Sequence, residues 1–351
     1  MAVEFWTTGV GIPHASARRA QRAEADRYDG MTVVDSQNLS GDPYVALALA
    51  AQVTTTLRLG TGVTNPVTRH AAATASAIAS VQGESGGRAV LGIGRGDSAL
   101  AHLGLAPAPL PVFERYLHDL HAYLAREEVP FRDGATVDRL SLANQPTSSR
   151  IQWLRPGYPP VPIDVAATGP KVIAIAAREA DQISFAVGAD PKRLRWGIGV
   201  AREARERAGL DPGSIPFGAY VNVVVHEDVG VAVRMAEGGL SLFARFSAMH
   251  GRTNGPTTAE EQRVMTAIHD GYDMNRHSQA GSPQAALLTE EFAREFGIIG
   301  PASYCVERLN ELIEIGLTRF VISGPAGGSG EAAEAEQRFV HDVMPALRRA
   351  S

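Results

Sequence analysis

Short runs of β-branched and apolar residues alternate with Ala-, Arg- and Glu-rich amphipathic segments along nearly the whole 351-residue chain. This alternation is typical of strand–helix units around a parallel sheet. The runs that we expect to be strands are Val3–Thr8, Met31–Asp35, Leu57–Val63, Ala89–Gly94, Ile163–Ala167, Gln182–Val187, Gly218–His226 and Arg319–Ser323. Eight such units close a (β/α)8 TIM barrel, so the sequence predicts an α/β protein of this class.

The segments between the strands predict the helices. They are His14–Tyr28, Pro43–Thr54, Ala72–Val81, Val112–Arg126, Pro170–Arg178, Pro191–Ala208, Val229–His250 and, at the end of the chain, Glu331–Arg349. Asp42-Pro43, Gly169-Pro170 and Gly300-Pro301 each place a proline where a helix begins, which is a favoured position for proline.

Two stretches, at about 128–160 and about 251–300, do not follow the alternation of strand and helix patterns. We therefore expect one barrel domain over residues 1–351 with two insertions. Both insertions are expected near the carboxyl ends of the strands, where barrel loops form active sites. For the stretch at about 128–160, a surface insertion with no role in the active site is an equally good interpretation.

Charge and composition limit the partners. The net charge is −5 with an isoelectric point near 6.1, which does not favour binding to nucleic acid or to an anionic membrane surface. No uncharged apolar run approaches the roughly 20 residues of a membrane-spanning helix. Cys305 is the single cysteine, and the start of the chain has no basic-then-apolar leader. We expect a cytoplasmic protein that binds a small molecule.

Two predicted strands end in glycines. Gly60 and Gly62 precede a polar turn, and glycine at a strand end often marks a close approach of the backbone to a ligand. A tight corner of the barrel is the equal alternative. The next strand leads into Gly94-Arg-Gly-Asp97, in which Asp97 stands where a dinucleotide-binding fingerprint needs glycine. Arg95 and Asp97 could contact an anionic ligand and transfer a proton, or they could pair with each other.

A third motif follows the strand at Ile163–Ala167. Thr168 or Gly169 opens a helix there, so free backbone N–H groups and the helix dipole favour an anion, and Lys171 adds positive charge. This pattern suits a cofactor phosphate. Ordinary helix capping is the simpler alternative.

Several classes of barrel enzyme lack their required residues. A Schiff-base aldolase needs a lysine at a strand end, but Lys171 and Lys192 both fall in helices. His118 and His121 lie on a predicted helix without the acidic residues of a metal site, so we expect no metal. No G-x-S-x-G motif offers a serine nucleophile.

Taken in order, four segments resemble the luciferase-like family, especially its coenzyme F420-dependent branch, which includes methylenetetrahydromethanopterin reductase. They are Val33–Ser36, Gly60–Pro66, Leu91–Asp97 and Ala166–Pro170. The resemblance spans essentially the whole chain and implies a barrel that binds F420, with FMN as the alternative cofactor. It also implies a homodimer.

The resemblance places a non-proline cis peptide at Gly62-Val63, against the deazaflavin ring. It places Asp35 near the cofactor and the segment Ala166–Val172 at the phosphate of the F420 tail. The implied cofactor-binding residues are Asp35, Ser36, Gly62, Val63, Arg95, Gly96, Asp97, Ala166, Ala167, Thr168, Gly169, Pro170, Lys171 and Val172.

The expected reaction is hydride transfer between reduced F420 and an unsaturated small molecule, with Asp97, Glu4 and Asp35 as the candidate catalytic residues. Glu4 resembles an acidic position of the reductase branch. In the glucose-6-phosphate dehydrogenase branch a catalytic histidine follows the acid of strand two, but here Ser36 follows Asp35. This departure counts against sugar-phosphate oxidation. The alternatives are an FMN-dependent luciferase-like monooxygenase and a non-catalytic flavin- or deazaflavin-binding protein.

Overall fold

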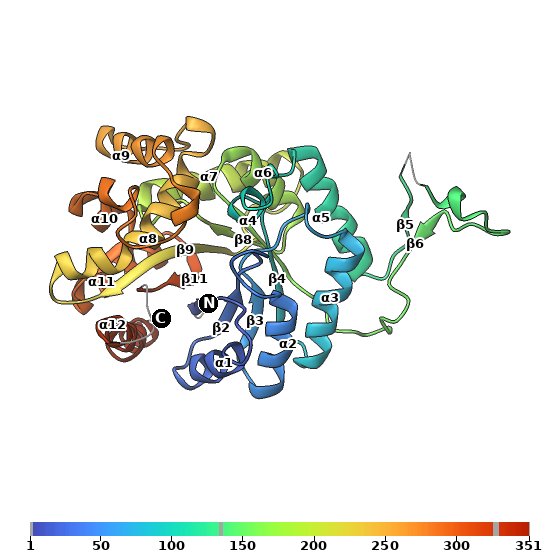
Figure 1. Cartoon of the computed structure of the whole chain (residues 1–351), viewed down its shortest axis with the longest axis horizontal. Coiled ribbons are helices and arrows are strands. Elements are labelled where there is room, and N and C mark those ends of the chain that lie inside the picture. The colour runs from blue at the N-terminus through green and yellow to red at the C-terminus, as the bar shows by residue number, and fades with distance from the viewer. Residues whose placement is uncertain (1–2, 133–135, 326–329, 351) are drawn as a thin grey trace.

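In a computed structural model the chain forms a closed parallel barrel surrounded by helices (Figure 1). The structure describes residues 3–132, 136–325 and 330–350. The barrel strands are β1 (Glu4–Gly9), β2 (Gly30–Val33), β3 (Arg58–Thr61), β4 (Ala89–Ile93), β7 (Ile163–Ala167), β8 (Gln182–Phe185), β9 (Phe217–Val225) and β11 (Leu317–Ser323). Strand β11 lies between β9 and β1, and the pairing of β8 with β9 closes the ring. The eight expected strands and the barrel class are confirmed.

Helices follow most barrel strands and cover the outside of the ring. They are α1 (Ser16–Ala25), α2 (Pro43–Val53), α3 (Ala71–Glu84), α4 (Ser98–Ala101), α5 (Leu110–Leu124), α6 (Pro170–Glu179), α7 (Pro191–Arg207), α11 (Ala302–Glu314), α12 (Glu331–Arg338) and α13 (Met344–Ala350), with a π-helical turn at Phe339–Val343. Prolines begin α2 and α6 as predicted, and the Asp42 side chain caps α2 by accepting from the backbone N–H groups of Tyr44 and Val45. No described helix is long and apolar enough to cross a membrane.

The segment between β9 and α11 forms a cover over one side of the barrel. It contains α8 (Val229–Ser247), α9 (Ala259–Asp270), α10 (Glu290–Phe296) and β10 (Ile298–Gly300), which pairs with β9. A Cβ atom at Gly239 of α8 would stand 2.3 Å from Asn222 Nδ2, in the second half of β9, and 3.3 Å from Ser323 Oγ, at the last residue of β11. Helix α8 therefore lies on the carboxyl side of the barrel. Helix α11, whose start the sequence marks at Gly300-Pro301 without predicting its extent, leads the chain into β11.

The other insertion lies elsewhere. It connects α5 to β7 and carries the short antiparallel strands β5 (Val129–Pro130) and β6 (Ser148–Ser149), which project away from the barrel in Figure 1. Its last part packs on α3, where the Tyr158 hydroxyl donates to the Ala79 carbonyl at 2.7 Å. The expected position on the carboxyl rim is wrong for this segment, because it follows a helix and not a strand.

A charged cluster fills the amino-terminal end of the barrel interior. Arg319 Nε lies 2.8 Å from Glu4 Oε2, and Arg319 Nη1 lies 3.4 Å from Asp164 Oδ2. Arg58 pairs with the other Glu4 oxygen at 3.2 Å. Burial raises the pKa of Asp164, whereas the charges of Arg319 and Arg58 outweigh burial and lower the pKa of Glu4. The cluster joins the first and last strands of the ring.

We expect Arg319→Met to lower the free energy of unfolding by about 3–5 kcal/mol, because it leaves the buried Asp164 carboxylate without its ion-pair partner. Only 7% of each of these two side chains is exposed. Arg58→Met is the matched control, since Arg58 is more exposed and its one ion pair among the described residues is with Glu4, and its effect should be below about 1 kcal/mol. Urea denaturation measures both, and equal effects would contradict the assignment.

Candidate active site

The carboxyl end of the barrel has an apolar floor. Val63, which follows β3, and Ala166 of β7 are half-buried and pack against the buried interior cluster that includes Trp6 and Val90. The Gly62-Val63 peptide bond is cis, as the resemblance implies. Leu242 and Phe246 of α8 and Tyr272 pack against the same cluster from the covering segment. Val63 and Ala166 thus keep part of their surface exposed at the carboxyl end of the barrel, on the side that faces α8.

The strand-end glycines pack against neighbouring protein atoms. A Cβ atom at Gly62 would stand 2.5 Å from Thr32 Cβ, and one at Gly92 would stand 2.0 Å from the Thr61 carbonyl oxygen. Gly60 meets Trp6 at 3.3 Å, and Gly96, with φ of +90°, meets Leu100 at 2.4 Å. The space beside these glycines is therefore filled by neighbouring protein atoms and is not left for a ligand. The alternative, tight corners of the barrel, describes them.

Asp35 lies buried at the end of β2. Thr64 Oγ1 donates to Asp35 Oδ2 at 2.6 Å, and Gln37 Nε2 donates to Asp35 Oδ1 at 2.6 Å. Burial is the main reason that the pKa of Asp35 is raised. A carboxyl group with a raised pKa is a candidate for proton transfer, and here it also holds the turn after β3 in place.

Three polar atoms in the segments after β2, β3 and β4 are buried without a hydrogen-bond partner among the described residues. They are Ser36 Oγ, Asn65 Nδ2 and His102 Nε2, which follow β2, β3 and β4 respectively. Asn38 Nδ2 donates to the His102 carbonyl at 2.9 Å and so joins two of these loops. Buried polar groups are normally hydrogen-bonded. The polar edge of a deazaflavin or flavin ring would supply the missing partners, so the residues fit such a group.

Asp97 pairs with an arginine of the covering segment. Arg245, near the end of α8, donates to Asp97 Oδ1 and stacks over the Tyr272 ring at 4.8 Å from its centroid. Arg95 instead donates to the Ala108 carbonyl at 2.7 Å. The expected alternative of an Arg95–Asp97 pair is therefore wrong. No sequence motif points to Arg245, which lies 148 residues from its partner.

His277 extends this network. Its Nδ1 lies 3.0 Å from the Tyr272 hydroxyl, and its ring lies edge-on to that of His102, with 6.0 Å between centroids. Burial, with the charges of Arg245 and His102, lowers the pKa of His277 to about 4. His277 is therefore neutral at pH 7.

This shift predicts a pH dependence of stability. A histidine that resists protonation in the fold stabilises it above the unfolded pKa of about 6.5, and that contribution is lost as the pH falls towards 4. Between pH 7 and pH 4 we expect wild type to lose about 1–3 kcal/mol more than His277→Gln, allowing for solvent screening. Denaturant titrations at both pH values measure this. The exposed His341→Gln should behave like wild type, and a His277 variant that does the same would refute the prediction.

The start of α6 faces the same side of the barrel. Gly169 is the N-cap and has no side-chain cap, so the first backbone N–H groups of α6 are free for a ligand. Lys171 is exposed beside them, and Asn254 Nδ2 of the covering segment lies 3.6 Å from a Cβ atom built at Gly169. Ala167, in contrast, buries its side chain in the core between strands and helices.

The structure thus gathers most of the expected site residues at the carboxyl ends of β2, β3, β4 and β7. Glu4 is the exception. It is the first residue of β1. The Trp6 indole, which donates to Glu4 Oε2 at 3.0 Å, lies in the barrel interior two residues further towards the carboxyl end of the strand. Glu4 therefore belongs to the ion cluster at the amino-terminal end and is not brought together with Asp97. The described residues hold no group of three potential metal ligands.

Comparison with known proteins agrees with this geometry. Residues 6–319 match the model of the luciferase-like monooxygenase family. The chain belongs to this enzyme family. The resemblance seen in the four sequence segments is therefore confirmed.

Some of the similar proteins are named as F420-dependent enzymes. The chain is 29% identical over 320 residues to 5,10-methylenetetrahydromethanopterin reductase of Methanolobus tindarius, covering 90% of this chain and 92% of the relative. It is 26% identical to F420-dependent glucose-6-phosphate dehydrogenase of Intrasporangium calvum, covering 86% and 83%. The solved coenzyme F420-dependent tetrahydromethanopterin reductase of Methanopyrus kandleri has the same fold, with a TM-score of 0.75 at 22% identity over 99% of this chain and all of that one.

Proposed function

We propose that this protein is an F420-dependent oxidoreductase that transfers a hydride between the deazaflavin and an unsaturated small molecule. The observation that carries the proposal is the half-buried floor of Val63 and Ala166, bordered by the unpartnered atoms of Ser36, Asn65 and His102. The similarity to an F420-dependent dehydrogenase of Intrasporangium calvum supports the choice of deazaflavin over flavin.

In this proposal each group of the site has one task. Val63 and Ala166 contact the face of the ring, and Ser36, Asn65 and His102 bond its polar edge. The start of α6 binds the phosphate of the cofactor tail. Reduced F420, when bound, supplies the hydride.

Asp97 is the group proposed for proton transfer at the site. Arg245 holds one of its oxygens and fixes the direction of the other, because a guanidinium and a carboxylate form a directional, charge-assisted pair. Asp35 stays buried and positions Thr64 and the turn that carries Val63. Helix α8 and Tyr272 exclude water from one side of the floor.

A fluorescence titration of the purified protein with F420, FMN and NADPH tests the cofactor. We expect F420 to bind at micromolar concentration or tighter and the other two to bind at least tenfold more weakly. Lys171→Ala should weaken F420 binding, whereas the exposed Lys192→Ala on α7 should not. Tight binding of FMN with no binding of F420 would favour the monooxygenase alternative. F420 binding without oxidation of reduced F420 by any acceptor would favour a binding protein.

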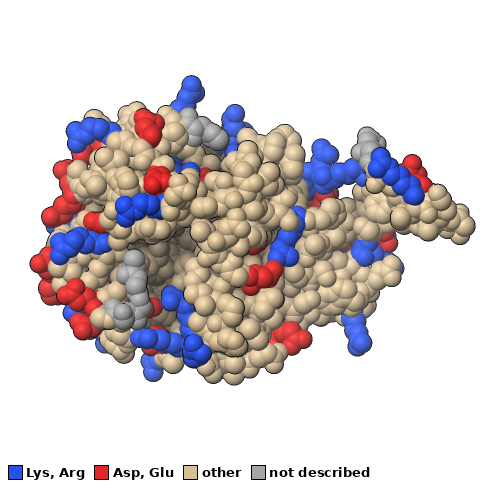
Figure 2. Space-filling view, in the orientation of Figure 1, with Lys and Arg blue, Asp and Glu red and all other residues tan. Residues whose placement is uncertain are grey.

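We also propose that a second copy of the chain packs on α2. Val45, Leu49 and Val53 are 62%, 49% and 36% exposed and lie one helical turn apart. Helix α2 contains no charged residue, and its surface is tan in Figure 2. A contiguous exposed apolar face of this kind is typical of a protein interface.

Leu49→Glu is therefore expected to produce a monomer in light scattering after size exclusion, because a carboxylate at the centre of an apolar interface loses its hydration without gaining a partner. Leu210→Glu, at an apolar residue that is 39% exposed after α7, is the control and should leave the dimer intact. A wild-type monomer at micromolar concentration would disprove the interface.

A further inference from the structure

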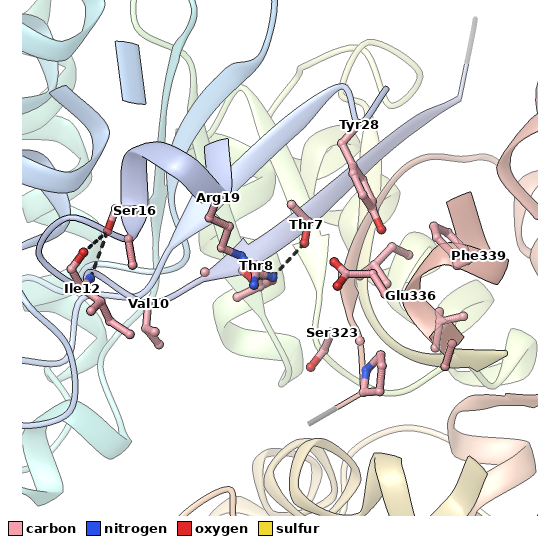
Figure 3. A pocket seen from close by; sticks show the side chains of 17 residues that line it. Thr7, Thr8, Val10, Ile12, Ser16, Arg19, Tyr28, Ser323, Glu336 and Phe339 are labelled. Atoms are coloured by element: carbon pink, nitrogen blue, oxygen red, sulfur yellow. Dashed lines mark hydrogen bonds between the residues drawn. The ribbon is translucent and has the colours of Figure 1, made fainter. Parts of the chain in front are cut away.

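A cavity of about 400 Å3 lies beside the barrel mouth, between the carboxyl ends of β1 and β11 and helices α1 and α12 (Figure 3). Its volume falls within the range of small-molecule sites. None of the described residues that line it belongs to the proposed F420 site. Thr8, one of the lining residues, has its hydroxyl 3.5 Å from that of Thr32, which in turn lies against Gly62. The cavity thus adjoins the proposed F420 site but is separate from it.

Arg19 of α1 supplies a positive charge to the cavity. Its Nη2 donates to the Thr8 carbonyl at 2.7 Å and to Thr7 Oγ1 at 3.3 Å. The side chain crosses Gly9, where a Cβ atom would stand 3.3 Å from Arg19 Cδ and Nε. Arg19 is therefore fixed against the end of β1, and no described carboxylate forms an ion pair with it.

Glu336 of α12 supplies a negative charge. Figure 3 shows its carboxylate in the cavity, close to the hydroxyl of Tyr28. Neither group has a hydrogen-bond partner among the described residues. Burial, together with the Glu336 carboxylate, raises the pKa of Tyr28, so the phenol keeps its proton and can donate to an acceptor. Two opposite charges thus line one cavity without forming a salt bridge to each other.

The remaining wall is largely apolar. It is formed by side chains of the loop after β1, of β9 and β11 and of the π-helical turn after α12, namely Val10, Ile12, Val223, Ile322 and Phe339. A ligand that satisfies the whole cavity therefore needs an anionic group for Arg19, a cationic group for Glu336 and a hydrocarbon part for this wall.

We propose that this cavity binds an α-amino acid with an apolar side chain. Its carboxylate accepts from the Arg19 guanidinium, its ammonium group donates to Glu336, and its side chain lies on the wall around Phe339. Charge-assisted bonds to both charged groups, which an α-amino acid carries on one carbon atom, make the site selective for a zwitterion over a molecule with a single charge. The inference goes beyond the proposed redox function and does not depend on the cofactor.

Isothermal titration calorimetry of the full chain with L-leucine and L-alanine tests this proposal. We expect L-leucine to bind, and L-alanine to bind more weakly because it covers less of the apolar wall. The analogues 4-methylpentanoate and 3-methylbutylamine each lack one charge and should bind at least about tenfold more weakly than L-leucine. No binding of either amino acid, or equal binding of the analogues, would overturn the proposal.

Variants locate the site. Arg19→Met and Glu336→Gln should each weaken L-leucine binding at least about tenfold. Arg18→Met and Glu331→Gln, at exposed positions of the same two helices, should not change it. If the control variants also weakened L-leucine binding, the amino acid would bind at a different site. A double-mutant cycle in urea without ligand completes the test, because strong coupling between Arg19 and Glu336 would show that the two side chains pair directly and leave no ligand site.

Discussion

Asp97→Asn is expected to lower kcat for oxidation of reduced F420 by about 10²–10⁴-fold, which is the usual contribution of a positioned proton-transfer group. The amide keeps the size of the side chain and can still contact Ser98, but it loses the negative charge that pairs with Arg245. Binding of F420 should change much less than kcat, because the floor and the start of α6 are untouched. Stopped-flow absorbance with 2-cyclohexen-1-one as the probe acceptor measures the rate, and fluorescence titration measures binding.

Glu4→Gln is the comparison that makes this result informative. Glu4 was an equal candidate for the proton donor in the sequence, but it lies in the ion cluster at the other end of the barrel. We expect its replacement to lower stability and to leave the pH profile of kcat unchanged. A loss of kcat as large as that of Asp97→Asn would show that the proton route passes through the barrel interior.

Gly92→Ala is expected to destabilise the fold by about 3 kcal/mol or more, because the new methyl group would stand 2.0 Å from the Thr61 carbonyl oxygen. That backbone cannot move freely, since Thr61 Oγ1 donates to the Gly92 carbonyl at 2.6 Å across the same pair of strands. Denaturation in urea measures the change. The variant should be destabilised equally with and without F420, as the glycine serves packing and not the ligand.

Gly94→Ala is the matched substitution two residues along the same motif. Its methyl group would meet the Val63 side chain at 3.3 Å, and a side chain can shift where a backbone carbonyl cannot. We expect a loss below about 1.5 kcal/mol but a measurable weakening of F420 binding, since Val63 forms the floor. If the two alanine variants were equally unstable, the distinction between backbone and side-chain contacts would be wrong.

The sequence predicts the barrel well because the signal is local and repeated. Each strand is a short β-branched run with a turn after it, and the prolines at positions 43 and 170 mark helix starts through their own backbone geometry. The same patterns do not reveal α8 as part of the cover over the barrel. An amphipathic helix after a strand has the same periodicity whether it returns along the barrel or crosses its rim.

The candidate site was predictable only in part. Motifs at strand ends identified Asp35, Val63 and the start of α6, because parallel strands bring their carboxyl ends together. The role of the glycines was misread, since a sequence does not show whether a ligand or a neighbouring strand fills the space beside them. Arg245 was missed because it reaches Asp97 only through the tertiary arrangement of α8.

The pairing of Glu4 with Arg319 ties together residues 315 positions apart in the chain. During synthesis β1 therefore leaves the ribosome long before β11, the strand that completes its surroundings, has been made. Until then one side of β1 has no neighbour, and the charge of Glu4 stays in water. The ring can close only after β11 has been synthesised. A truncated chain without β11 would therefore form an open sheet with an exposed edge, and other chains could pair with that edge.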